Sequence, residues 1–134
     1  MPRWKTEKEQ LAAIKENSYL IRYIHNPSEK VQLAAVKENE YSIQHIHNQY
    51  ETVQLASVRK DGDSIQYIYN PSEKVQLAAV KQNAYSIRYI YSPSEKVIRE
   101  FLSQIENGSI ESEEKYLIDE TKLSDELKLL WELL

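Results

Sequence analysis

Tyrosine and histidine residues recur at intervals of 22 residues, and their spacing suits a recognition surface. Each interval holds two of these positions four residues apart, as in Tyr41 and His45. A four-residue spacing places two side chains on one face of a helix, and tyrosine combines a large contact area with a polar tip. We predict that this tyrosine column either binds a partner or packs between repeats and stiffens them. The predicted partner-binding residues are Tyr19, Tyr23, Tyr41, His45, Tyr67, Tyr85 and Tyr89, with Asp63 at the equivalent position of the third repeat.

A second set of rings follows each column pair two residues later. It consists of His25, His47, Tyr69 and Tyr91. On a continued helix these rings would lie near the edge of the core, because successive residues turn by about 100°. We therefore expect a structural role for them.

A row of lysine and arginine residues is the alternative to the tyrosine column as a binding site. Lys30 and Lys37 lie seven residues apart and would project together from one helix. Aligned cations can follow phosphates or an acidic partner, and tyrosines beside them would suit single-stranded nucleic acid. The plainer interpretation is a solvated helix face. The predicted basic ridge consists of Lys30, Lys37, Arg59, Lys74 and Lys81.

Catalytic and metal-binding patterns are weak in this sequence. It holds no cysteine and three histidines, and we find no phosphate loop and no ordered nucleophile, base and acid. His45 and His47 would diverge by about 200° on a helix, so they would not meet at one ion. We predict a non-enzymatic protein without a metal or cofactor.

A strict repeat positions all these residues. VQLAAV stands at 31–36 and 75–80, and VQLASV stands at 53–58 between them. EQLAAI at 9–14 and VIREFL at 97–102 extend the series in steps of 22 residues with no insertion. A fixed period of this length is typical of stacked helical repeats.

The first helix of each repeat has a start and a stop signal. In the second repeat we expect Asn26 to cap it, Pro27 to take its first position and Glu29 to complete a capping box. The helix would run over 27–38 and end at Asn39 in the left-handed conformation. In the first repeat Thr6 and Glu9 form the expected box. The equivalent helix ends are Asn17, Asp61 and Asn83.

A short second helix is expected over 41–47, with Ile43 and Ile46 facing the core and the tyrosine column facing away. Val31, Ala34 and Ala35 would face one neighbouring repeat, and Leu33 and Val36 the other. The predicted fold is therefore an all-α solenoid, right- or left-handed, of about five 22-residue helix pairs with a C-terminal helical cap.

The last 26 residues differ from the array in charge. The chain has a net charge of −4, and residues 109–134 hold eight acidic residues and three lysines. This segment therefore carries −5, which leaves +1 for residues 1–108. We divide the chain into a repeat array (1–108) and an acidic linker with a capping helix (109–134). Ser124 would begin that helix, and its acids could also bind the ridge or present carboxylates to a basic groove. The expected apolar stripe is Leu127, Leu130, Trp131 and Leu134.

The pattern L-A-A-V-K-x-N-x-Y-S-I-x-x-I, found at 33–46 and 77–90, resembles a family of short helical repeats of unknown function from bacteria and phages. The resemblance covers most of residues 6–102 and implies no catalytic residues. It implies a phage-type inhibitor that sterically blocks a bacterial defence complex of the CRISPR kind, and hence a protein partner such as a host defence nuclease complex.

We infer the cellular location from the hydropathy of the chain and from its first residues. No apolar run is long enough for a membrane helix, and the residues after Met1 are polar. We expect a cytoplasmic protein, in the host cytoplasm if it is phage-encoded, with no membrane contact. A protein partner is the main prediction and nucleic acid the alternative.

Overall fold

The computed structural model describes residues 3–134; the start at Met1, where we expected no leader, lies outside them. These described residues form helices and turns and no strand. Long α-helices alternate with short 3₁₀ helices, labelled η, up to α5. The long helices are α1 (Glu7–Glu16), α2 (Glu29–Glu38), α3 (Glu51–Lys60), α4 (Glu73–Gln82), α5 (Glu95–Glu106) and α6 (Asp125–Leu133). The short helices are η1 (Ser18–Tyr23), η2 (Glu40–His45), η3 (Gly62–Tyr67), η4 (Ala84–Tyr89), η5 (Ser112–Leu117) and η6 (Glu120–Lys122).

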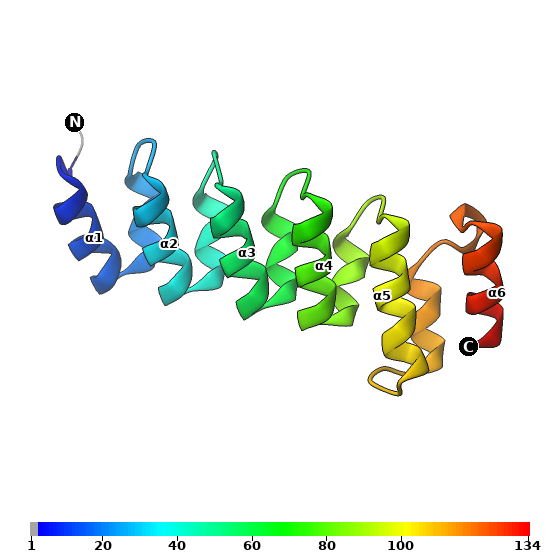
Figure 1. Ribbon diagram of the computed structural model, residues 1–134. Helices are drawn as coiled ribbons and strands as arrows, with labels where there is room; N and C mark the ends of the chain where they lie inside the picture. Colours follow the sequence, from blue (N-terminus) through cyan, green and yellow to red (C-terminus); the bar gives the residue numbers. More distant parts are fainter. Residues whose placement is uncertain (1–2) are drawn as a thin grey trace.

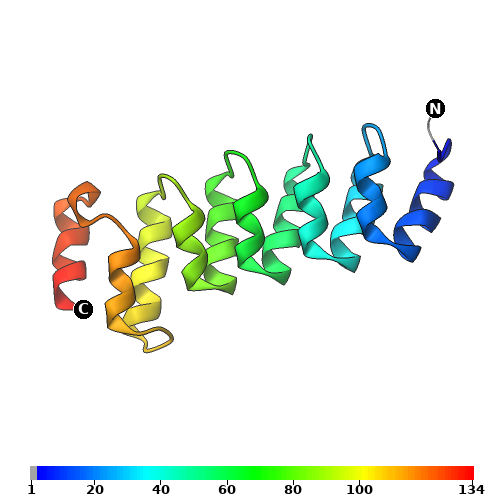
Figure 2. The same cartoon turned by 180° about the vertical axis from the view of Figure 1, so that it is seen from behind.

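Each element packs on its neighbours in chain order. The helices α1 to α5 lie side by side, and each short helix packs against its own long helix and the next one (Figures 1 and 2). We call residues 7–28, 29–50, 51–72 and 73–94 units 1 to 4, and the residues from 95 onward unit 5. The turns between units lie along one edge, at the top of Figure 1. None of the described helices has the length and apolar character needed to cross a membrane.

The long helices begin two residues later than the sequence predicted. Ser28, not Asn26, caps α2, because its extended backbone lets its Oγ accept the N–H of Val31 at 3.3 Å. Asn26 instead has a positive φ of 50°, which asparagine tolerates. Ser72 and Ser94 cap α4 and α5 in the same way, and α3 begins after Tyr50 with no side-chain cap bond. The prediction for Thr6 is confirmed: its Oγ1 accepts the N–H of Glu9 at 3.1 Å.

The long helices end without the predicted left-handed residue. Asn39 is extended, with φ −152° and ψ 114°. Its side chain accepts the N–H of Tyr41 at 3.0 Å, so it caps the following η2 rather than terminating α2 by conformation. The predicted 41–47 helix is a 3₁₀ helix that ends at His45. The same caps stand at Asn17, Asp61 and Asn83.

The core is one continuous row of aliphatic side chains. Val31, Ala35 and Val36 of α2 and Ile43 and Ile46 of the following segment are buried, as are their equivalents in units 3 and 4. The predicted inward isoleucine pairs are confirmed in units 1 to 4. Leu33 and Ala34 are only half-buried, because that side of α2 faces hollows rather than a neighbouring repeat.

The last segment packs on unit 5. The helix α5 ends at Glu106 and is followed by Asn107 and by Gly108, which has a φ of 79°. Ser124 caps α6, which buries Leu127 and Trp131. Arg99 of α5 binds Glu126 of α6 at 2.9 Å, so one acid of the tail contributes to this junction. The predicted linker is in part the helix η5, whose Lys115 carbonyl accepts the indole N–H of Trp131 at 3.4 Å.

Candidate functional site

The short helices carry the tyrosine column, and its residues contact each other between units. The ring of Tyr19 in unit 1 meets the ring of His45 in unit 2 edge to face, with centroids 4.9 Å apart. Tyr41 in unit 2 meets Tyr67 in unit 3 in the same geometry at 6.0 Å. The first column position of one unit therefore touches the second position of the next, a contact of about 0.5–1.5 kcal/mol.

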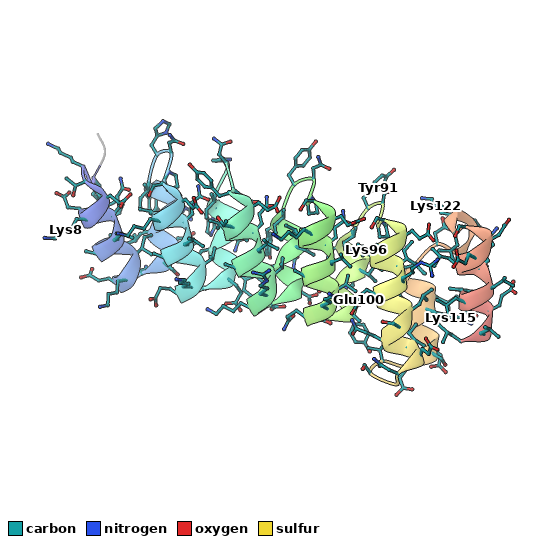
Figure 3. All side chains as sticks on the ribbon, viewed as in Figure 1. Lys8, Tyr91, Lys96, Glu100, Lys115 and Lys122 are labelled. Atoms are coloured by element: carbon teal, nitrogen blue, oxygen red, sulfur yellow. The ribbon has the colours of Figure 1, made fainter. Side chains whose placement is uncertain are left out.

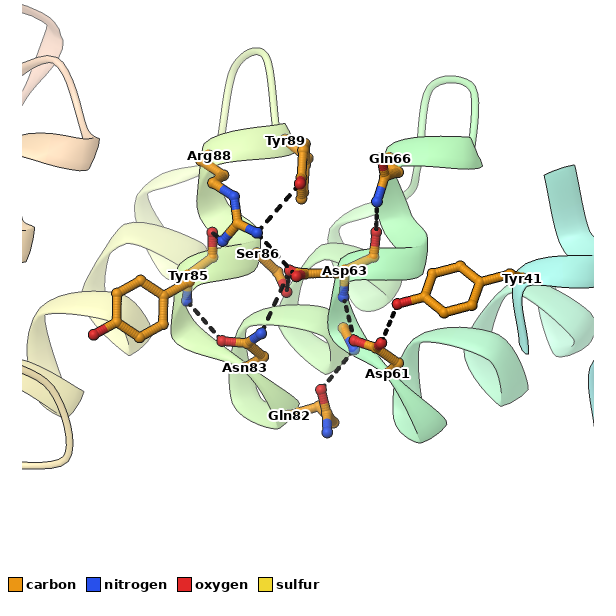
Figure 4. Close-up of polar contacts among 11 residues, drawn as sticks. Tyr41, Asp61, Asp63, Gln66, Gln82, Asn83, Tyr85, Ser86, Arg88 and Tyr89 are labelled. Atoms are coloured by element: carbon orange, nitrogen blue, oxygen red, sulfur yellow. Dashed lines mark hydrogen bonds and ion pairs between the residues drawn. The ribbon is translucent and has the colours of Figure 1, made fainter. Parts of the chain in front are cut away.

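Unit 3 replaces this ring contact with a polar one. Asp63 occupies the first position, and its carboxylate lies 2.9 Å from the Arg88 guanidinium of unit 4 (Figure 4). Its other oxygen accepts the hydroxyl of Ser86 at 3.0 Å. Arg88 also donates to the Tyr89 hydroxyl at 3.2 Å and lies over the Tyr89 ring. Both carboxylate oxygens of Asp63 are thus bound by side chains of unit 4.

A second hydrogen bond of this network joins units 2 and 3. The Tyr41 hydroxyl donates to Asp61, the residue that caps η3 (Figure 4). This hydrogen bond, together with burial and the negative charge of Asp61, raises the pKa of Tyr41 to about 12. Tyr41 therefore acts as a donor within the protein.

The column divides into exposed and half-buried side chains. Tyr23 is 60% exposed, and Tyr19, Tyr67 and Tyr89 are also exposed. The others, Tyr41, His45 and Tyr85, are half-buried. The exposed members retain surface for a partner, even though several also contact a neighbouring unit.

The second set of rings does not lie where we expected. The chain leaves each 3₁₀ helix before these residues, so the rings stand on the turns and not at the core edge. Tyr69 and Tyr91 are 94% and 96% exposed, and His25 and His47 are exposed as well. Figure 3 shows Tyr91 projecting from the turn before α5. We call His25, His47, Tyr69 and Tyr91 the tip row.

The sequence contains a signal for this exposure that the helical periodicity does not include. Each tip-row residue follows the last buried isoleucine of its unit and precedes an asparagine or serine of the turn. Residues in such connections lie at the surface and often carry function.

Hollows separate neighbouring turns along the same edge. One of 570 Å³ lies between units 1 and 2 and is lined by Arg22, His25, His45 and His47. The expected divergence of His45 and His47 assumed a continuous α-helix, yet both line this hollow. Burial, and then the charge of Arg22, lower the pKa of His45. In residues 3–134 no group of three histidine or acidic side chains is placed to hold a metal ion.

The next hollow, between units 2 and 3, has different chemistry. It measures 680 Å³ and is lined by Gln44, Gln49, Tyr67 and Tyr69, among others. The buried Gln32 holds the turn at the end of unit 2, because its side-chain amide donates to the Asn48 carbonyl at 2.9 Å and its oxygen accepts the Tyr50 N–H at 3.3 Å. The turn that carries His47 is therefore held by side-chain hydrogen bonds.

The basic ridge lies on the long helices. All five of its residues are exposed, and no ion pair in the described part of the chain involves them. Lys30 and Lys37 border a hollow of 690 Å³ with Leu33 and Ala34. Arg59, Lys74 and Lys81 border one of 500 Å³ with Leu77 and Ala78. Aliphatic residues, and no tyrosines, line these hollows beside the ridge.

Comparisons of the chain with protein-family models, curated proteins and solved structures found no match. The resemblance to short bacterial and phage repeats stays a prediction.

Proposed function

We propose that this protein is a non-enzymatic binding protein that recognises a protein partner through its tip row and the exposed tyrosines of its column. The observation that carries this proposal is the exposure of Tyr69 and Tyr91, each above 90%. A ring so exposed adds almost nothing to the packing of its own chain. Tyrosine and tryptophan anchors are enriched where binding energy concentrates in interfaces.

We further propose that the units form a solenoid, which would give the partner a long and regular surface. The support is the 22-residue spacing of the helix starts and the packing of each unit on its neighbours. The hydrogen bonds of Gln32 to Asn48 and Tyr50 favour a preorganised edge, which lowers the ordering cost of binding.

The test compares two matched variants in affinity capture from bacterial lysate with and without nuclease. The tip variant changes His25, His47, Tyr69 and Tyr91 to Ala, and the ridge variant changes Lys30, Lys37, Lys74 and Lys81 to Gln. All eight positions are exposed, so both variants should keep the helix content and melting temperature of the original protein. We expect a nuclease-resistant protein partner that the tip variant loses and the ridge variant keeps. Equal recovery by the tip variant would refute the proposal.

A narrower version follows from the resemblance alone: a phage-type inhibitor that occupies a surface of a host defence complex in the host cytoplasm. Tyrosines would anchor the contact, and charge would set its orientation and association rate. Identification of the captured partner tests it directly. A defence nuclease whose activity falls on addition of this protein would support the inhibitor, and a partner with no role in defence would exclude it.

A nucleic-acid-binding repeat protein is the second candidate. The cations of the basic ridge favour it, because they form no ion pair in the described residues and remain available to phosphates. Its affinity would fall steeply between low and moderate salt, and the ridge variant would lose it while the tip variant kept it. No binding to single- or double-stranded DNA or RNA even at low salt would remove this candidate.

A further inference from the structure

The hollow between units 1 and 2 is the most cationic of the edge. Its charged and titratable lining groups are Arg22, Tyr23, His25, His45 and His47, and no aspartate or glutamate is among the residues that line it. The three histidines of the whole chain therefore meet at one place.

Arg22 supplies the permanent charge of this hollow. Its guanidinium lies over the rings of Tyr19 and Tyr23, 4.7 and 5.2 Å from their centroids. Stacking of this kind orients an arginine without consuming its charge. None of the ion pairs in residues 3–134 includes Arg22, whereas the equivalent Arg88 is paired with Asp63.

We propose that this hollow binds the carboxylate of an acidic side chain on the protein partner. The inference rests on the proposed function and names the chemistry of one of its contacts. One permanent cation matches a singly charged anion. Histidine N–H groups and the side-chain amides of Asn26 and Asn48, which also line the hollow, supply further donors. The neighbouring hollow between units 2 and 3 has glutamine at the position of Arg22, so the site belongs to one junction of the array.

Binding at this hollow should depend on pH. The groups that face His45 are Arg22 of η1 and the ring of Tyr19, and burial and Arg22 lower the pKa of His45. An anion bound beside Arg22 would offset the positive charge of Arg22 and so favour the imidazolium form of His45. Carboxylate binding therefore strengthens as the pH falls from about 7 to about 6 and weakens when the ligand itself protonates near pH 4.

The experiment follows the histidine ring signals of the full chain by NMR while a probe is added. The probe is the acetylated, amidated tripeptide Gly-Glu-Gly, and Gly-Gln-Gly is its neutral match. We expect the charged peptide to shift the ring signals of His25, His45 and His47 with millimolar affinity, as suits so small a ligand, and more strongly at pH 6 than at pH 7. The neutral peptide should leave them unchanged.

Two variants make the test specific. Arg22→Gln introduces the residue already present at the equivalent Gln44 and Gln66, so the fold tolerates it, and it should weaken the response at least fivefold. Lys30→Gln removes an exposed cation of the ridge and should not change it. Equal responses to the two peptides, or an unchanged response in Arg22→Gln, would overturn the proposal. So would inorganic phosphate that shifts the signals at lower concentration than the glutamyl peptide, because the site would then select phosphate.

Failure here can be separated from failure of the proposed function. If the peptides give equal responses while the tip variant still loses its captured partner, only the carboxylate site is wrong. If the tip variant keeps the partner, the proposed function fails whatever the peptides show.

Discussion

Arginine occupies the same repeat position at two junctions between units, and its contacts differ between them. Between units 3 and 4, Arg88 is held by Asp63 and Tyr89, and Asp63 also accepts a hydrogen bond from Ser86 (Figure 4). Between units 1 and 2, the equivalent Arg22 lies over two tyrosine rings and has no carboxylate among the residues that line its hollow. At the first junction the charge of Arg88 is paired within the protein. At the second junction the charge of Arg22 remains available to a ligand.

The position of a residue within the repeat does not by itself determine its role. Both arginines occupy the same place in a 22-residue period, but Arg88 meets Asp63 of the unit before its own, whereas Arg22 belongs to unit 1, which no repeat precedes in the described residues to supply a carboxylate. Unit 3 carries Asp61, Gly62 and Asp63 where unit 2 carries Asn39, Glu40 and Tyr41. We infer that unit 3 is specialised for packing on unit 4, which substitutions at this junction can test.

Gly62→Ala should produce the largest loss of stability. A Cβ at this buried position would come within 2.4 Å of the Ala79 carbonyl oxygen and 2.5 Å of the Ser86 Oγ, so the backbones of units 3 and 4 would have to separate. We expect the free energy of unfolding to fall by about 2–3 kcal/mol, measured by urea unfolding. The control is Ser18→Ala, at the equivalent position of unit 1, which should change it by less than about 0.5 kcal/mol. Equal effects would show that the unit 3 junction is not closely packed.

Tyr41→Phe should have the next largest effect, because it removes the hydroxyl that donates to Asp61. A hydrogen bond to a charged acceptor contributes about 1.5–3 kcal/mol, and water can replace part of it here. The folded pKa of about 12 lies above the ordinary value of 10. This contribution is therefore complete below pH 10 and is lost as the pH rises through about 12.

Ultraviolet titration of tyrosinate checks this assignment. The original protein should show a tyrosine component that ionises late, near pH 12, and Tyr41→Phe should lack it. Tyr69→Phe serves as the control, since Tyr69 is 94% exposed and the late component should persist. A late component that survives in Tyr41→Phe would contradict the hydrogen bond to Asp61.

Arg88→Gln and Arg22→Gln compare the two junctions directly. Each variant removes a cation from beside tyrosine rings, which costs about 0.5 kcal/mol at an exposed site. Arg88→Gln also breaks the pair with Asp63 and should cost about 0.5–1 kcal/mol more. We expect this excess to shrink in high salt, because partly exposed ion pairs are screened. An equal loss in both variants would mean that Asp63 and Arg88 do not stabilise the junction.

Much of the fold followed from the sequence, because the period and the alternation of apolar residues determine it. The inward pair Ile43 and Ile46 and the cap at Ser124 were both predicted correctly. The helix starts were placed wrongly. Asn26 and Ser28 are both good caps in sequence, and only the backbone conformation on either side of the proline decides between them.

The candidate site was less predictable, because it depends on where the short helices stop. A 100° rotation per residue holds within an α-helix, but η2 is a 3₁₀ helix that ends at His45. On the assumption of a continuous α-helix we predicted that Tyr69 and Tyr91 lie at the edge of the core. In the structure they lie on turns and are exposed to solvent. The meeting of Arg22 with His45 and His47 depends on contact between units, which a one-dimensional pattern does not contain.

Replacement of His45 should have the smallest effect on stability. Its ring packs edge to face on Tyr19 at the junction between units 1 and 2. Burial, and then the charge of Arg22, lower its pKa, so the fold favours neutral imidazole. Its contribution to stability is present above the ordinary histidine pKa of about 6.5 and is lost as the pH falls below it. His45→Tyr introduces the residue found at the equivalent Tyr23, Tyr67 and Tyr89, and should flatten the decline of the melting temperature between pH 7 and pH 5. His47→Tyr, a change to the exposed ring of the tip row, is the matched control and should leave the decline unchanged. If His47→Tyr flattened it instead, the acid sensitivity of this junction would belong to the turn and not to the contact between His45 and Tyr19.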